Sequence, residues 1–86
     1  MRKTTALRKP SSPLTAILAA NIRAFRAANN LSQEEFADRC GLHRTYVGSV
    51  ERGERNVTLS TLEVLASVMG ISVPQLLAGE MLKHDR

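Results

Sequence analysis

The chain has 86 residues, which is enough for one small domain with a single hydrophobic core. Its composition is 43% hydrophobic and 23% charged, which excludes an intrinsically disordered chain. No apolar run approaches the length of a membrane span, and we expect no signal peptide, because the basic N-terminus is not followed by a clear apolar stretch with a cleavage site. The single cysteine, Cys40, can form no internal disulfide and has no metal-site spacing. We therefore expect a cytoplasmic globular domain without a metal or a cofactor.

The net charge of +4 is unevenly distributed along the chain. All of it belongs to residues 1–13, which hold four basic residues and no acid, whereas residues 14–86 balance eight basic against eight acidic residues. Arg44, Arg52 and Arg55 cluster in the middle of the chain. A local concentration of arginine on a small domain points to nucleic acid as the partner.

The first predicted helix has an N-cap at Ser12 and a proline, Pro13, at its first helical position. The Asn29-Asn30 pair ends this helix, because asparagine tolerates the left-handed C-terminal conformation. Between these ends, apolar residues recur at helical spacing and form one stripe, which consists of Leu14, Ile17, Leu18, Ile22 and Phe25.

The second predicted helix begins with a capping box formed by Ser32 and Glu35, and it ends at a glycine, Gly41. The third helix follows almost at once, with His43 in its N-cap position. Two helices joined by so short a turn form a helix-turn-helix.

Two further short helices are predicted in the C-terminal third. Ser60 and Glu63 have the spacing of another capping box, and Gly70 has the position of a C-terminal glycine. Ser72 is expected to cap a fifth helix, with Pro74 in its first turn.

These signals predict an all-α fold, a compact five-helix domain over residues 13–82 with the helix-turn-helix at its second and third helices. Residues 1–12 have no apolar period and are expected to form a flexible basic tail, and residues 83–86 a short C-terminal tail. For the basic tail two roles are open: a solubilising segment, or an arm that contacts phosphates or the minor groove.

The third helix divides into two faces on a helical wheel. Val47, Val50 and Tyr46 lie on the inner side. The outer side has no apolar side chain and combines arginine with small polar residues: Arg44, Thr45, Gly48, Ser49 and Arg52. Arginine reads guanine through two hydrogen bonds, and glycine permits a close approach to the major groove. An ordinary solvated face has a similar composition, so the wheel alone leaves both interpretations open.

The wider sequence favours DNA. Residues 31–77, LSQEEFADRCGLHRTYVGSVERGERNVTLSTLEVLASVMGISVPQLL, resemble the lambda-repressor-like (Cro-type, or Xre) helix-turn-helix family. The resemblance is carried by Leu-Ser-Gln-Glu-Glu, Gly41, the Val47/Val50 pair, Glu51-Arg52-Gly53 and the late Leu-x-x-Leu-Ala. Within this family, LHRTYVGSVERGERNVTL resembles the controller proteins of restriction–modification systems.

The resemblance implies a role for each polar residue around the third helix. Arg44, Thr45 and Ser49 occupy the positions that read bases. Gln33, at the start of the second helix, is expected to bind a phosphate with help from the helix N-terminus. The other residues expected at the DNA backbone are His43, Tyr46, Arg52, Arg55, Asn56 and Thr58.

Several of these residues have a second interpretation. Gln33 is also an ordinary first helical residue, and His43 also serves as a cap. Tyr46 can cover the edge of the core instead of reaching a phosphate, and Arg55 can enter the minor groove. Gly48 replaces the bulkier residues often found at its position, and we interpret it as clearance for DNA.

Arg26 and Glu51 lie at the edges of the apolar stripes of the first and third helices. Several members of the family have a partly buried salt bridge at such positions. We therefore expect these two residues to pair, and Glu51→Ala to destabilise the fold by leaving Arg26 without its partner.

The C-terminal third has more apolar residues than one small core requires. A symmetric dimer would cover the surplus, and the alternative is an apolar rim exposed on a monomer. The residues expected at the dimer interface are Leu59, Val68, Ile71, Val73, Leu76 and Met81.

Together these features predict a homodimeric transcriptional regulator that binds a pseudo-palindromic DNA operator, regulates its own gene and possesses no small-molecule effector site. RNA polymerase is a further candidate partner. An enzyme is not expected, because His43, His84 and Cys40 form no catalytic pattern. The alternative is an antitoxin-like or coactivator-like protein-interaction module with the same fold, for which the outer face of the third helix would be acidic or apolar.

Overall fold

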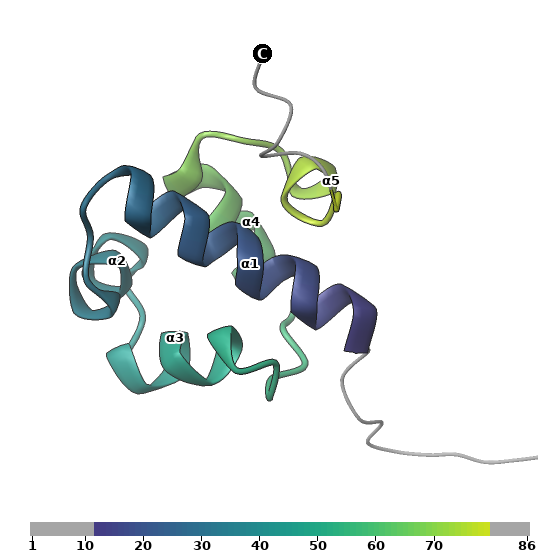
Figure 1. Cartoon of the computed structure of the whole chain (residues 1–86), viewed down its shortest axis with the longest axis horizontal. Coiled ribbons are helices and arrows are strands. Elements are labelled where there is room, and N and C mark those ends of the chain that lie inside the picture. The colour runs from purple at the N-terminus through teal and green to yellow at the C-terminus, as the bar shows by residue number, and fades with distance from the viewer. Residues whose placement is uncertain (1–11, 80–86) are drawn as a thin grey trace, which may run out of the picture.

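The computed structural model describes residues 12–79 of the chain, in which helices and turns occur without a strand. Its α1 crosses the molecule, with α3 along one side and α5 along the other (Figure 1). This arrangement confirms the expected all-α, five-helix fold. The helices are α1 Ser12–Ala28, α2 Gln33–Cys40, α3 Arg44–Glu51, α4 Leu59–Met69 and α5 Val73–Leu76.

The start of α1 differs by one residue from the prediction, since Ser12 is already helical rather than the N-cap. Residues 1–11 of the expected N-terminal tail, the expected C-terminal tail at 83–86 and Met81 lie outside the described residues. Within residues 12–79, no helix has the length and apolar character needed to cross a membrane.

The predicted capping box of α2 is present. The Ser32 hydroxyl accepts a hydrogen bond from the backbone N–H of Glu35, and the Glu35 carboxylate accepts one from the backbone N–H of Ser32. The bond from the Ser32 backbone N–H favours the ionised carboxylate, so the pKa of Glu35 is lowered. At the other end of α2, Gly41 has a φ of +68°, the left-handed conformation that the prediction required.

The start of α4 contradicts the prediction. The N-cap is Thr58, whose hydroxyl accepts from the backbone N–H of Thr61 at 3.2 Å, and Ser60 lies inside the first turn. The prediction selected Ser60 because a glutamate, Glu63, follows it by three residues. Threonine is also a favourable N-cap residue, and with Thr58 as the cap the helix begins at Leu59.

The core fills the space between α1 and the other helices, and Phe36, Ile22 and Val47 are almost completely buried. Val47 and Val50 anchor α3 as the helical wheel predicts, whereas Leu14, the first residue of the α1 stripe, remains 47% exposed.

Leu76 belongs to the core and not to an exposed surface. It is 0% exposed, because α5 turns this side chain toward α1 and α4. The buried Asn21 side chain of α1 donates a 2.8 Å hydrogen bond to the Leu76 carbonyl and so fixes α5 against α1. The expected role of Leu76 at a dimer interface is therefore wrong.

Candidate nucleic-acid interface

The first turn of α3 presents two polar residues to solvent. Its N-cap is His43, as expected, and the ring Nδ1 accepts from the backbone N–H of Thr45 at 3.4 Å. The Thr45 hydroxyl lies 3.2 Å from the same nitrogen. Arg44 and Thr45 are both exposed, which agrees with the outer face predicted for this helix. The cap fixes the backbone from which both side chains project.

Ser49, by contrast, is not on an open face. Its exposed fraction is 6%, and its hydroxyl donates to the Tyr46 carbonyl at 2.7 Å. The same oxygen accepts from Nε of Arg55 at 2.8 Å. The wheel placed Ser49 outside because it treated α3 as an isolated cylinder, whereas the segment after the helix folds back over this position.

Arg55 returns to α3 from that segment. Its guanidinium carbon lies 4.8 Å from the centroid of the half-buried Tyr46 ring, a cation–π arrangement. Tyr46 thus packs against the core and also supports a cation.

The expected pair between Arg26 and Glu51 is present and bidentate. Nε of Arg26 donates to Glu51 Oε2 at 2.8 Å, and Nη2 donates to Oε1 at 2.9 Å. A further N–H of Arg26 donates to the Leu31 carbonyl at 3.0 Å, just before α2. The pair therefore connects α1 with α3 and with the entrance to α2.

Gln33 completes this network, since its amide nitrogen donates to Glu51 Oε1 at 3.0 Å. Burial alone would raise the pKa of Glu51, but hydrogen bonds from Arg26 and Gln33, together with the charges of Arg26 and Arg23, outweigh it and leave the pKa lowered. Glu51 is consequently an ionised carboxylate inside the fold, and Gln33 is held at the N-terminus of α2.

Arg23 is a participant that the sequence interpretation missed. Its Nη1 donates to the backbone carbonyl of Glu51 at 2.7 Å, at the C-terminal end of α3. The available signal was its position, three residues before Arg26 on the same helix, which places both arginines beside α3.

Gly48 is buried rather than open to a partner. A Cβ atom built there would lie 3.4 Å from Arg52 Nη1 and 3.5 Å from Gln33 Oε1, both in flexible side chains. The expected clearance above Gly48 is therefore occupied in the protein alone by these two side chains.

The segment after α3 supplies the other expected residues. Arg52, at the C-cap of α3, pairs with Glu54 through bonds of 3.0 and 3.1 Å, and both side chains are more than half exposed. Asn56 is exposed, and Thr58 caps α4.

The residues expected at a dimer interface occupy different environments. Leu59 is 77% exposed, and Val68, Ile71 and Val73 are partly buried. Val64, which was not among them, is 39% exposed on the same helix as Leu59. Apolar side chains on α4, after it and at the start of α5 are thus at least partly exposed.

Cys40 is buried, and burial raises the pKa of its thiol to about 11. It is therefore a thiol rather than a reactive thiolate at neutral pH. Among residues 12–79, no three His, Cys, Asp or Glu side chains are grouped so that they could hold a metal ion.

A capped α2, a glycine turn and a short α3 with exposed arginine and threonine define a helix-turn-helix DNA-binding protein. The model of a helix-turn-helix family matches residues 22–76. The chain belongs to this family of transcriptional regulators.

Three proteins illustrate the relationship. Control protein C.SmaI of Serratia marcescens is 60% identical over 70 residues, which cover 81% of this chain and 83% of that protein. The crystal structure of the hypothetical transcription factor NHTF from Neisseria has a TM-score of 0.77 and 42% identity, covering 93% of this chain and 91% of that one. The restriction-modification controller protein C.AhdI from Aeromonas hydrophila has a TM-score of 0.66 and 42% identity, with coverages of 72% and 94%.

Proposed function

We propose that this transcriptional regulator binds a pseudo-palindromic operator as a homodimer, regulates its own gene and controls a restriction–modification system. The observation that carries the proposal is the exposed start of α3, with Arg44 and Thr45 on a capped helix. The similarity to a control protein and to a restriction-modification controller protein supports the biological role.

In this proposal Arg44 and Thr45 read base edges in the major groove. Two N–H groups of Arg44 match the O6 and N7 acceptors of guanine, and Thr45 offers a hydroxyl and a methyl group. No ion pair or hydrogen bond within residues 12–79 holds the Arg44 guanidinium. It can therefore approach a base without first losing a protein partner.

The residues that we assign to phosphate contacts lie around Arg44 and Thr45. Gln33 is held at the N-terminus of α2, where free backbone N–H groups favour an anion. Arg52 can exchange Glu54 for a phosphate, because an exposed ion pair contributes little to stability. We assign backbone contacts to these two residues and to His43, Tyr46, Arg55, Asn56 and Thr58.

The dimer would cover the exposed apolar side chains of α4 and of the start of α5. Leu59 and Val64 are exposed there, and Glu63 is the one charged residue between Asn56 and Gly79. A two-fold pair would present two copies of α3 to successive major grooves, about one DNA turn apart.

A protein-interaction module of the antitoxin or coactivator type is less well supported. Such a module would need an apolar or acidic outer face on α3. The exposed residues of that helix are Arg44 and Thr45, and neither is apolar or acidic.

The test is fluorescence anisotropy with labelled DNA from upstream of the gene, compared with a scrambled duplex at the same salt concentration. We expect preference for the upstream DNA, and about 1–3 kcal/mol less discrimination at one base position per half-site in Arg44→Ala. Arg39→Ala, which removes an equal charge from an exposed position on α2, is the matched control. Equal affinity for both duplexes would overturn the proposal.

A further inference from the structure

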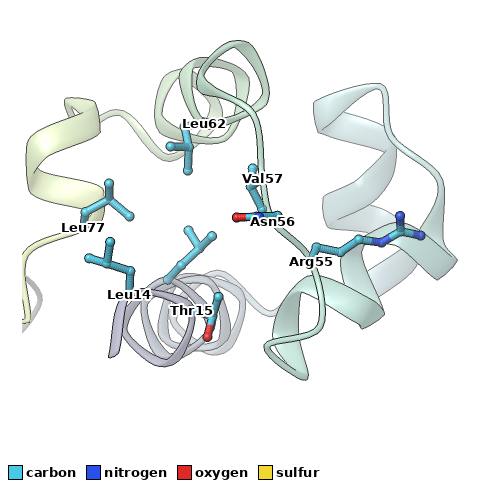
Figure 2. Close-up of a pocket in the computed structure, with 8 residues that line it drawn as sticks. Leu14, Thr15, Arg55, Asn56, Val57, Leu62 and Leu77 are labelled. Atoms are coloured by element: carbon cyan, nitrogen blue, oxygen red, sulfur yellow. The ribbon is translucent and has the colours of Figure 1, made fainter. Parts of the chain in front are cut away.

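The segment that carries Arg55 has an apolar side and a polar side. Arg55, Asn56 and Val57 border a pocket that is otherwise lined mainly by leucines of α1, α4 and the end of α5. Figure 2 shows the Arg55 side chain extending away from Leu14, Leu62 and Leu77. The backbone thus rests on the core, while the guanidinium lies over α3, against Tyr46.

The Ser49 hydroxyl has one hydrogen to donate and two lone pairs with which to accept. Its hydrogen goes to the Tyr46 carbonyl, 2.7 Å away in the preceding turn. That bond fixes the hydroxyl rotor, so that a lone pair is directed at Nε of Arg55, 2.8 Å away. With 6% exposure, Ser49 has no open path to a base edge.

Arg55 is therefore held at two points, by a hydrogen bond at Nε and by the Tyr46 ring beneath its guanidinium. The bond to Ser49 uses one of five guanidinium N–H groups and leaves the four on the terminal nitrogens for other acceptors. A long side chain that is already ordered loses less conformational freedom when it binds.

We propose that Ser49 is a positioning residue for DNA binding, which acts through Arg55 and does not itself read a base. This inference rests on the proposed function, because it requires that Arg55 contacts the operator. In this inference the buried Ser49 hydroxyl orients the guanidinium of Arg55, six residues further along the chain.

The experiment combines Ser49→Ala with Arg55→Ala in a double-mutant cycle, using operator anisotropy at one salt concentration. Ser49→Ala should bind operator DNA roughly two- to tenfold more weakly per half-site, because Arg55 must then be ordered during binding. In the Arg55→Ala background the same substitution should change the affinity by less than about twofold. In the control background Arg39→Ala, which removes an equal charge from α2, the full loss should persist.

A second measurement does not depend on DNA. In NMR spectra of the free protein, Ser49→Ala should shift the Arg55 Nε–Hε resonance and accelerate its exchange with water, because its acceptor is gone.

The outcomes separate the two proposals. If the wild-type protein prefers operator DNA but Ser49→Ala binds with unchanged affinity, the positioning role is wrong. An equal loss in the Arg55→Ala background would show that Ser49 affects DNA binding independently of Arg55, which also overturns it. If the wild-type protein does not distinguish operator from scrambled DNA, the proposed function fails, and the DNA-binding role of Ser49 fails with it.

Discussion

Replacing Glu51 by alanine should destabilise the fold strongly. The Glu51 side chain is 5% exposed and accepts three side-chain hydrogen bonds, two from Arg26 and one from Gln33. Its removal leaves a guanidinium without a counter-charge between α1 and α3. The loss therefore includes the cost of an unpaired charge in addition to the missing attraction.

The magnitude follows from the exposure of Arg26. Breaking a buried pair by removing one partner typically costs about 3–5 kcal/mol. Because the Arg26 side chain is 19% exposed and keeps its bond to the Leu31 carbonyl, water can partly replace Glu51. We therefore expect the lower end, about 3 kcal/mol, which corresponds to a fall in Tm of roughly 12–24 °C for a domain of this size.

The assay is thermal and urea unfolding followed by circular dichroism between pH 7 and pH 3. The pKa of Glu51 is lowered in the folded protein from its ordinary value of 4.5. The stability that it contributes is therefore complete above about pH 4.5 and is lost as the pH falls through the lower folded-state pKa. The difference between wild type and Glu51→Ala should accordingly shrink on acidification.

Glu54→Ala is the matched control. It removes the carboxylate of the other ion pair between described residues, in which both side chains are more than half exposed. Its Tm should stay close to that of the wild type. A decrease of less than about 4 °C for Glu51→Ala at pH 7, equivalent to about 1 kcal/mol, would refute the role given to the Arg26–Glu51 pair.

Three further changes test other parts of the fold and surface. Gly48→Ala should raise the free energy of unfolding by up to about 1 kcal/mol in urea titrations, because the added Cβ meets only ordinary contacts and alanine favours the helix; a clear decrease would contradict this. Thr58→Ala should lower it by about 1 kcal/mol in the same assay, since α4 loses its cap; no change would exclude that cap as a source of stability. Leu59→Lys, at a 77% exposed position, should shift sedimentation toward the monomer with unchanged circular dichroism; an intact dimer would place the interface elsewhere.

Local signals in the sequence predicted much of the fold. The capping box of α2, the left-handed glycines after α2 and α4, and the serine cap of α5 each depend on neighbours within a few residues. The Arg26–Glu51 pair, although distant in sequence, was anticipated from the edges of two apolar stripes and a family resemblance. The hydrogen bond from Gln33 to Glu51 was not anticipated, because it depends on how α2 and α3 are packed together.

Ser49 and Leu76 show where prediction from periodicity stops. A helical wheel gives the direction of a side chain from its own helix, but not what the rest of the chain places over it. Arg55 lies over Ser49 from a segment without helical periodicity. Leu76 lies in the C-terminal third of the chain, where the sequence has many apolar residues. Only the packing of α5 against α1 shows that this side chain belongs to the core and not to an interface.

Gly48 and the β-branched residues Thr45, Val47 and Val50 give α3 a weak intrinsic helix propensity. Contacts with the core and at both helix ends compensate for it. Val47 and Val50 anchor its inner face in the core, and His43 caps its first turn. Arg23 binds the carbonyl of Glu51 at its last turn. The contacts of Val47, Val50 and Arg23 lie away from the exposed Arg44 and Thr45, so most of the support of α3 does not depend on the side chains that we assign to the bases. A helix stabilised by its own surface pairs would have to give some of them up on binding, whereas the core contacts of Val47 and Val50 and the bond from Arg23 would remain in place on DNA.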